Sequence, residues 1–210
     1  MPSHPGFTRV DHPLLARAIG HLRDTRTASP EFRRWLDDAA SLLAWEVTRT
    51  LETRRVRVRS PLATTHSVEL RREVVLVPIL RAGVGMLEAF LRVVPDAGVG
   101  FVGQKRDEAT LQPATYLANL PAATRTGEVI VLDPMLATGG SAAATLALLK
   151  QQGAKRIRLA CLFAAPPGVQ RIARDHPDVP VFAATLDPKL TAQGYIVPGL
   201  GDAGDRCFGT

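Results

Sequence analysis

The chain has 210 residues, of which 46% are hydrophobic and 22% charged, and its formal net charge at pH 7 is +6. This length suits one domain with a substantial core, here expected over residues 1–210. The balance of apolar and charged residues is that of a soluble globular protein. No apolar run approaches the roughly 18 residues that span a membrane, and the first ten residues lack the apolar stretch of a signal peptide. We therefore expect no association with a membrane.

The cysteines and the positive charge restrict the compartment and the partners. Only two cysteines occur, Cys161 and Cys207, which favours a reducing, cytoplasmic compartment over a disulfide framework. The net charge suits either an anionic substrate or a nucleic acid. Within residues 54–59, Val56 and Val58 alternate with Arg57 and Arg59, the pattern of a strand with one solvent-exposed face. No aromatic residues lie between these arginines as stacking platforms, so the charge alone does not choose between the partners.

Hydrophobic periodicity predicts two helices in the first part of the chain. Residues 13–24 place apolar side chains on one helical face. A second helix begins at Ser29, which offers a capping hydroxyl and is followed by proline, and continues to Val47. An arginine-rich ribbon then covers residues 55–70, with a break at Ser60 and Pro61.

From residue 74 onward, short apolar strands alternate with helices. The predicted strands are 74–79, 99–102, 129–132, 157–163 and 181–185, and the predicted helices are 85–92, 141–151 and 168–175. This alternation predicts an α/β fold with an open, mostly parallel sheet flanked by helices. Residues 104–116 are polar and show little periodicity, so we expect a long loop there, of the kind that often covers an active site.

The most informative segment is 129–141, Val-Ile-Val-Leu-Asp-Pro-Met-Leu-Ala-Thr-Gly-Gly-Ser. It reads as a buried strand, an acid at the strand end, a loop of small residues and a helix start. In such a loop, backbone N–H groups can converge on an anion, assisted by the helix dipole and by the hydroxyls of Thr138 and Ser141. Asp133 can accept hydrogen bonds from sugar hydroxyls at the sheet edge where open α/β sheets bind ligands. The pattern favours a phosphate and ribose site over a glycine-rich turn without a ligand.

Two further segments point to the same edge. The strand that begins at residue 74 leads into Arg81, Ala82 and Gly83, and an arginine at a strand end can pair with a phosphate. Taken alone, such an arginine is more often a surface ion-pair partner. Residues 194–205, Gly-Tyr-Ile-Val-Pro-Gly-Leu-Gly-Asp-Ala-Gly-Asp, suit a backbone-lined pocket for a flat polar ligand. The alternative is an irregular surface tail, against which the apolar start of the segment argues.

Together, segments 78–83, 133–141 and 194–205 closely resemble the uracil phosphoribosyltransferase family, and the likeness extends over residues 11–210. Pro134 stands where most phosphoribosyltransferases of this fold have a second acid, as it does in the uracil-specific branch. The resemblance implies the type I phosphoribosyltransferase fold with a small hood and a β-arm, the N-terminal helices and the C-terminal segment forming the hood over the base. It implies transfer from 5-phospho-α-D-ribose 1-diphosphate (PRPP) to uracil, giving UMP and diphosphate in pyrimidine salvage.

The resemblance also implies residues that bind PRPP. Segment 136–141 would bind the 5-phosphate, and Asp133 would bind the ribose hydroxyls. Arg81 and its peptide bond to Ala82, expected to be cis, would face the pyrophosphate, over which Arg106 would close. The full implied set is Arg81, Ala82, Arg106, Asp133, Pro134, Met135, Leu136, Ala137, Thr138, Gly139, Gly140, Ser141 and Asp202.

By the same resemblance, uracil would be bound by Tyr195, Ile196, Gly201, Asp202 and Ala203, largely through the backbone. Asp202, Arg106 and Asp133 would be the catalytic residues. Mg²⁺ would be bound mainly through PRPP and water, without direct ligation by a side chain. Members of the family form homodimers or larger homo-oligomers, and some respond to GTP, for which this sequence carries no signature.

Lys105 and residues 187–191 depart from the family pattern, which puts loop closure and the hood in question. Two rival functions remain at this stage. One is an RNA-binding regulator built on the same fold, with residues 54–59, Arg71 and Arg72 as its footprint, although a base pocket at 194–205 makes nucleic acid the weaker partner. The other is a purine phosphoribosyltransferase.

Overall fold

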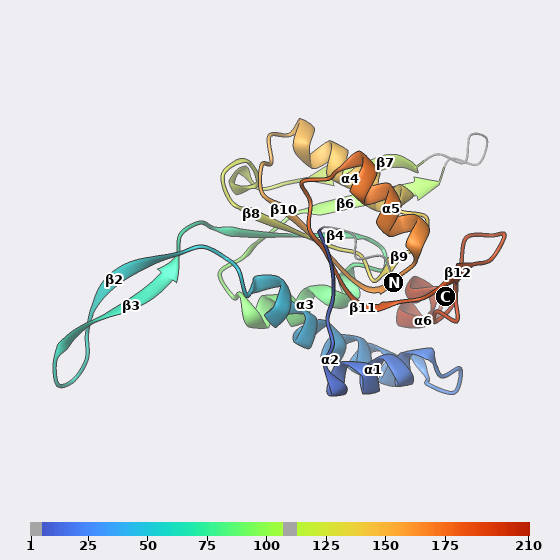
Figure 1. The fold of residues 1–210 in the computed structure, drawn as a ribbon, viewed down its shortest axis with the longest axis horizontal. Helices are drawn as coiled ribbons and strands as arrows, with labels where there is room; N and C mark the ends of the chain where they lie inside the picture. The colour runs from blue at the N-terminus through green and yellow to red at the C-terminus, as the bar shows by residue number, and fades with distance from the viewer. Residues whose placement is uncertain (1–5, 107–112) are drawn as a thin grey trace.

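The computed structural model describes residues 6–106 and 113–210, and its centre is an open β-sheet with helices on both faces (Figure 1). Neighbouring strands are parallel except β6 and β7, so the expected open, mostly parallel α/β sheet is confirmed. In spatial order the main strands are β1 (Phe7–Arg9), β11 (Val181–Leu186), β10 (Ile157–Ala164), β8 (Glu128–Leu132), β4 (Val74–Leu80), β6 (Phe101–Arg106) and β7 (Pro113–Asn119). The short β5 (Gly98–Val99) pairs with β4, and β9 (Met135–Leu136) pairs with β10.

The helices form two layers because the central strands alternate their side chains between the faces. In β8, Ile130 and Leu132 belong to the core on one face, and Val129 and Val131 to the core on the other. The first face is covered by α1 (Pro13–Arg23), α2 (Ser29–Thr48), α3 (Val84–Val93) and α6 (Ala203–Phe208). The second is covered by α4 (Gly140–Gln151) and α5 (Pro166–Asp175), drawn above the sheet in Figure 1.

The predicted helices correspond to the observed ones within a few residues. The largest difference is in α5, which begins at Pro166 rather than at residue 168. Prolines are tolerated in the first turn of a helix because their missing N–H groups have no partner there in any case. Between β7 and β8 the chain makes one 3₁₀ turn (Ala122–Arg125). No helix in the described part of the chain is long and apolar enough to cross a bilayer.

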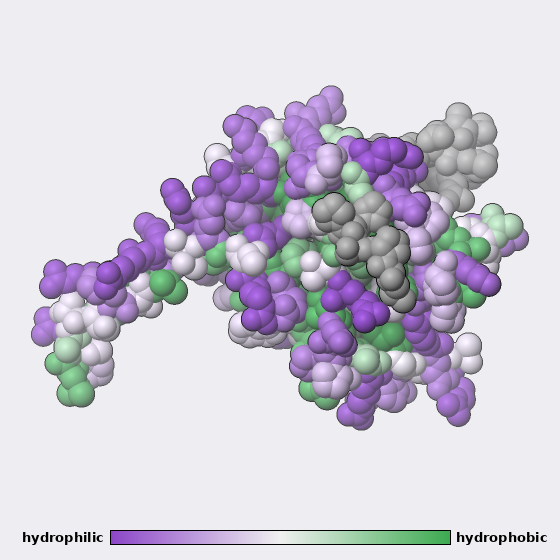
Figure 2. Space-filling view, in the orientation of Figure 1, coloured by the Kyte–Doolittle hydropathy of each residue, from purple (hydrophilic) through white to green (hydrophobic). Residues whose placement is uncertain are grey.

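The arginine-rich ribbon forms a two-stranded arm that extends away from the sheet (Figure 1). Its strands are β2 (Thr53–Arg59) and β3 (Thr64–Leu70), and nearly every side chain in them is exposed. The prediction of one buried face is therefore wrong within this chain, because no second layer packs on the arm. Figure 2 shows a mostly hydrophilic arm with an apolar tip, where Leu62 is 97% exposed.

The loop expected over 104–116 is wrong at both ends. Strand β6 continues to Arg106 and β7 begins at Pro113, with Gln104 opposite Thr115. Residues 107–112 lie outside the described ranges. Polar residues form strands here because antiparallel pairing satisfies the backbone hydrogen bonds, while this edge of the sheet needs no apolar alternation.

The C-terminal segment returns to the strand ends through a small hairpin. Strands β12 (Lys189–Leu190) and β13 (Ile196–Val197) pair antiparallel, and α6 follows. The segment thereby reaches the edge at which β4 and β8 end.

We expect Gly83→Ala to destabilise the fold by about 2 kcal/mol or more, because overpacking a tight contact forces the backbone to move. A Cβ atom at Gly83 would lie 2.7 Å from both the N and O atoms of Ile79, and would also overlap the carbonyl oxygen of Leu132. Gly20→Ala is the matched control, since a Cβ there meets nothing within 4 Å and alanine favours a helix by about 1 kcal/mol. Thermal unfolding of both variants tests this, and equal melting temperatures would contradict it.

Candidate functional site

A cavity of about 300 Å³ opens where the central strands end. Strands β4 and β8 run side by side, with Pro78 opposite Leu132, so the residues that follow them meet at this edge. Small-ligand sites of this volume are common at such edges. The lining is Ile79, Leu80, Arg81, Ala82, Asp133, Met135, Ala137, Thr138, Gly139, Gly140, Ser141, Ala142, Gly194, Tyr195, Ile196, Gly201, Asp202, Ala203 and Gly204.

One wall is the loop that enters α4. Gly139 caps this helix in the left-handed conformation, with φ of 76°. The first turn closes when the amide of Ala143 donates to the carbonyl of Gly139 at 2.9 Å. The amides of residues 140–142 precede that bond, so they form the positive end of the helix at the cavity wall. With the hydroxyls of Thr138 and Ser141, they make a wall suited to a phosphate.

Asp133 supplies a carboxylate between this loop and the end of β8. Its backbone amide donates to the carbonyl of Ala160 at 3.1 Å, which continues the sheet pairing. Its Oδ1 accepts from the amide of Met135 at 3.3 Å. Burial raises the pKa of Asp133 to about 7, against the smaller lowering effect of that hydrogen bond. A carboxylate in this position is well placed to accept hydrogen bonds from hydroxyl groups of a ligand.

Arg81 provides positive charge across the cavity. Its Nη2 lies 3.0 Å from Oδ1 of Asp205, and its Nη1 donates to Oγ1 of Thr210 at 3.3 Å. The Arg81 side chain is 59% exposed, and an ion pair so open to water is weak. The guanidinium can therefore exchange this partner for an anionic ligand at little cost.

The expected cis peptide between Arg81 and Ala82 is wrong by one position. The cis bond joins Leu80 to Arg81, at the point where β4 ends. A second cis bond joins Val197 to Pro198 in the glycine-rich segment.

The glycine-rich segment forms another wall of the cavity, and its last residue, Asp205, is the partner of Arg81. Ile196 is buried, while Tyr195 is half-exposed at the rim. Asp202 caps α6, its Oδ1 accepting from the amide of Asp205 at 2.9 Å. The segment approaches the α4 loop closely, since a Cβ at Gly194 would lie 3.5 Å from Cγ2 of Thr138. The segment thus lies against the α4 loop at this point.

Most residues proposed from the sequence meet in this cavity, with three exceptions. Pro134 and Leu136 are buried and do not line it. Their carbonyls instead accept from the amides of Phe163 and Ala165, both at 2.9 Å. Arg106 ends β6, and its side chain lies outside the described part of the structure.

Sequence reasoning missed five residues that line the cavity. They are Ile79, Leu80, Ala142, Gly194 and Gly204. The two glycines belong to the glycine-rich segment that was singled out, so they could have been included. Ile79 and Leu80 likewise belong to segment 78–83, which was singled out, whereas Ala142 is an apolar helix residue that only the tertiary arrangement places at the cavity.

Comparisons with known proteins agree with this geometry. Residues 9–210 match the family model described as uracil phosphoribosyltransferase. A uracil phosphoribosyltransferase from Clostridium kluyveri is 48% identical over 204 residues, which cover 97% of this chain and 98% of the relative. A solved structure of a protein from Aquifex aeolicus is 35% identical, with a TM-score of 0.91 and coverage of 96% of this chain and 97% of that one.

A more distant structure shows the fold alone. The purine phosphoribosyltransferase from Pyrococcus horikoshii is 17% identical, with a TM-score of 0.50, and the match covers 72% of this chain and 83% of that one. The sheet and its flanking helices are therefore the type I phosphoribosyltransferase fold.

We expect Asp133→Asn to raise the melting temperature at pH 8 relative to the unmodified protein. The folded pKa of about 7 exceeds the ordinary value of 3.8, so the native state loses stability as the pH rises between these values. The amide variant has no charge to bury and still accepts from Met135. For a chain of this size, each 1 kcal/mol corresponds to about 2–4 °C.

Calorimetry at pH 4 and pH 8 checks this expectation. The difference between variant and unmodified protein should be small at pH 4 and favour the variant at pH 8. A variant that melts lower at pH 8 would show that the Asp133 carboxylate stabilises the fold.

Proposed function

The chain belongs to the uracil phosphoribosyltransferase family, and we propose that it transfers the 5-phosphoribosyl group of PRPP to uracil, yielding UMP and diphosphate. One observation carries the proposal. A single cavity holds an anion-binding helix end, a carboxylate, an arginine and a backbone-lined wall. These are the groups needed for a phosphate, a ribose, a pyrophosphate and a flat base.

The α4 loop would bind the 5-phosphate of PRPP. Its support is the set of amides at residues 140–142 together with the hydroxyls of Thr138 and Ser141. Asp133 would then accept hydrogen bonds from the ribose hydroxyls. Because burial holds its pKa near neutrality, such hydrogen bonds would favour the charged carboxylate and lower that pKa.

The pyrophosphate would lie beside Arg81, which would leave Asp205 to bind it. Arg106 would approach from the end of β6. Asp133 and Asp202 line the same cavity, and Mg²⁺ usually keeps several waters when it binds substrate phosphates, so these two acids would contact it mainly through water. The residues present therefore fit a cation shared with PRPP, which would neutralise charge on the diphosphate when bound.

Uracil would occupy the wall formed by the glycine-rich segment. The backbone at Ile196, Gly201 and Ala203 offers donors and acceptors at fixed positions, with Tyr195 at the rim. Cytosine presents a different pattern of donors and acceptors, so it would leave polar groups unpaired. A fixed backbone wall therefore suits one base.

The reaction would break the bond between C1 of the ribose and the pyrophosphate and form a bond from C1 to N1 of uracil, and the proton on N1 would be released. Attack from the opposite face inverts C1, and positive charge develops on the ribose in the transition state. Arg81 and Arg106 would stabilise the negative charge on the leaving diphosphate. The apolar side chains around the cavity would limit the access of water to the positively charged ribose.

A base-competition assay tests this function. The protein is incubated with PRPP, Mg²⁺ and either uracil, cytosine or hypoxanthine, and nucleotide and diphosphate are measured. We expect UMP from uracil, and kcat/KM values at least about 100-fold lower for the other bases. Asp133→Asn should fold and lose most turnover. Comparable rates with hypoxanthine would instead identify a purine enzyme.

We further propose that the protein is a cytoplasmic homo-oligomer whose copies meet at the arm. Both cysteines are free and buried, as suits a reducing compartment. A two-stranded hairpin alone is marginally stable, yet β2 and β3 expose nearly all their side chains, including Val68, and Leu62 in the turn between them is exposed as well. Trp45 is 66% exposed at the arm's base, where it lines a groove of about 730 Å³. A second copy would cover these apolar groups.

Light scattering after gel filtration checks the assembly. We expect a dimer or larger species, and a shift toward the monomer for Trp45→Glu, because the charge would be buried at the contact. Leu14→Glu is the control, since Leu14 is also exposed but lies on α1, away from the arm. A monomeric unmodified protein would contradict the proposal.

A further inference from the structure

The proposed base wall consists of backbone atoms, so something else must fix where those atoms lie. The segment between Ile196 and Gly201 is irregular and contains Gly199, whose φ is 53°. A Cβ at Gly199 would overlap the backbone of Ile196, so the turn is tight and admits no side chain. Pro198 restrains part of this turn from within, and contacts from outside the segment restrain Gly199 and Leu200.

Asp187 supplies the first restraint. It is 3% exposed and lies just after β11. Its Oδ2 accepts from the amide of Gly199 at 2.9 Å. Burial opposes ionisation of Asp187, but the hydrogen bonds from Arg23 and Gly199 outweigh it and hold its pKa below the ordinary value. The acceptor is thus a charged carboxylate, which makes the stronger kind of hydrogen bond.

Arg23, at the end of α1, completes this contact. Its two terminal nitrogens donate to the two oxygens of Asp187 at 2.6 and 2.7 Å. Nη1 also donates to the carbonyl of Gly199 at 2.9 Å, and the guanidinium lies over the ring of Phe163 at 4.9 Å. One ion pair therefore binds both the N–H and the C=O of Gly199.

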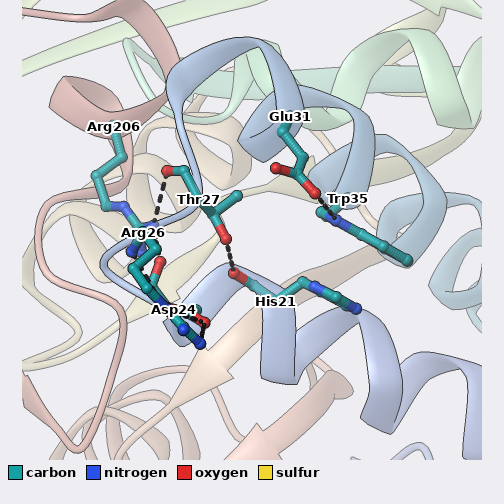
Figure 3. Close-up of polar contacts among 7 residues, drawn as sticks. All are labelled: His21, Asp24, Arg26, Thr27, Glu31, Trp35 and Arg206. Carbon is teal, nitrogen blue, oxygen red and sulfur yellow. Dashed lines mark hydrogen bonds and ion pairs between the residues drawn. The ribbon is translucent and has the colours of Figure 1, made fainter.

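Arg206, on α6, holds the next residue. Its Nη1 donates to the carbonyl of Leu200 at 3.0 Å and also to that of Leu22. Its Nη2 donates to the carbonyl of Asp24 at 2.7 Å and approaches that of Thr27 at 3.4 Å. Figure 3 shows this side chain directed at the turn between α1 and α2. Burial lowers the pKa of Arg206.

We propose that Arg23, Asp187 and Arg206 are positioning residues for the base, and this rests on the function proposed above. They fix Gly199 and Leu200 against the end of α1. In the sequence these two residues lie between Ile196 and Gly201, which line the cavity. The three side chains act through the backbone and do not line the cavity. Recognition of uracil therefore depends on contacts that lie behind the wall.

Lysine variants test this role, because lysine keeps the charge but cannot reproduce the planar set of donors. In Arg23→Lys and Arg206→Lys we expect KM for uracil to rise about tenfold while KM for PRPP stays within about twofold, because a small displacement of a binding group is costly. Discrimination between uracil and cytosine should fall in both variants.

Arg158→Lys is the matched control. Arg158 is also largely buried and donates to the carbonyl of Val47 at 2.8 Å and to Oγ1 of Thr50 at 2.7 Å. These contacts are at the C-terminal end of α2, whereas Arg206 contacts the turn that precedes the N-terminal end of α2. The control should lower the melting temperature and leave KM for uracil unchanged.

Amide hydrogen exchange of the substrate-free protein separates this proposal from the proposed function. The peptide covering 194–203 should exchange faster in Arg23→Lys and Arg206→Lys, but not in Arg158→Lys. If the unmodified protein forms no UMP, the proposed function fails. If exchange and KM for uracil are unchanged in both variants, or change equally in the control, the positioning role is wrong.

Discussion

The parallel pairing of β4 with β8 is the constraint on which the rest of the site depends. Because the strands run in the same direction, the residues that follow them emerge at one edge of the sheet. Arg81 and Asp133 thereby become neighbours in one cavity, although 52 positions (133 − 81) separate them in the chain. The helix dipole of α4 acts at this edge for the same reason, since α4 begins just after β8.

Two charged groups of the cavity, Arg81 and Asp133, differ in how easily a ligand can replace their present surroundings. Arg81 pairs with Asp205 in water, and this weak contact can give way to a ligand. Asp133 is different, because burial raises its pKa to about 7 before any hydroxyl group arrives. In the proposed function, Arg81 would leave Asp205 to bind the anionic substrate. Ionisation of Asp133 would be unfavourable until the hydroxyl groups of the sugar donate hydrogen bonds to it.

The base end of the cavity is built in the opposite way. Partly buried arginines donate to carbonyls there, and Asp187 is buried beside Arg23. Breaking such a buried pair is costly because it leaves an uncompensated charge. In the proposed function, the rigid wall would hold the base, and Arg81 beside it would give up its ion pair to bind the leaving diphosphate. The end of α1 is fastened to the C-terminal part of the chain, by Arg23 to Gly199 and by Arg206 to Leu22.

The sequence by itself determined the alternation of strands and helices, the phosphate-type loop at 137–141 and the glycine-rich segment, because periodicity, turn residues and small side chains act locally. It could not decide the polar strands at 104–106 and 113–116, since the pairing of backbone groups across a ladder leaves no apolar pattern. The ion pair of Arg23 with Asp187 spans 164 residues, and no local pattern distinguishes either residue from a surface charge. Only the tertiary structure decided that contact, because chain packing removed Asp187 from water and brought Arg23 against it beside Gly199.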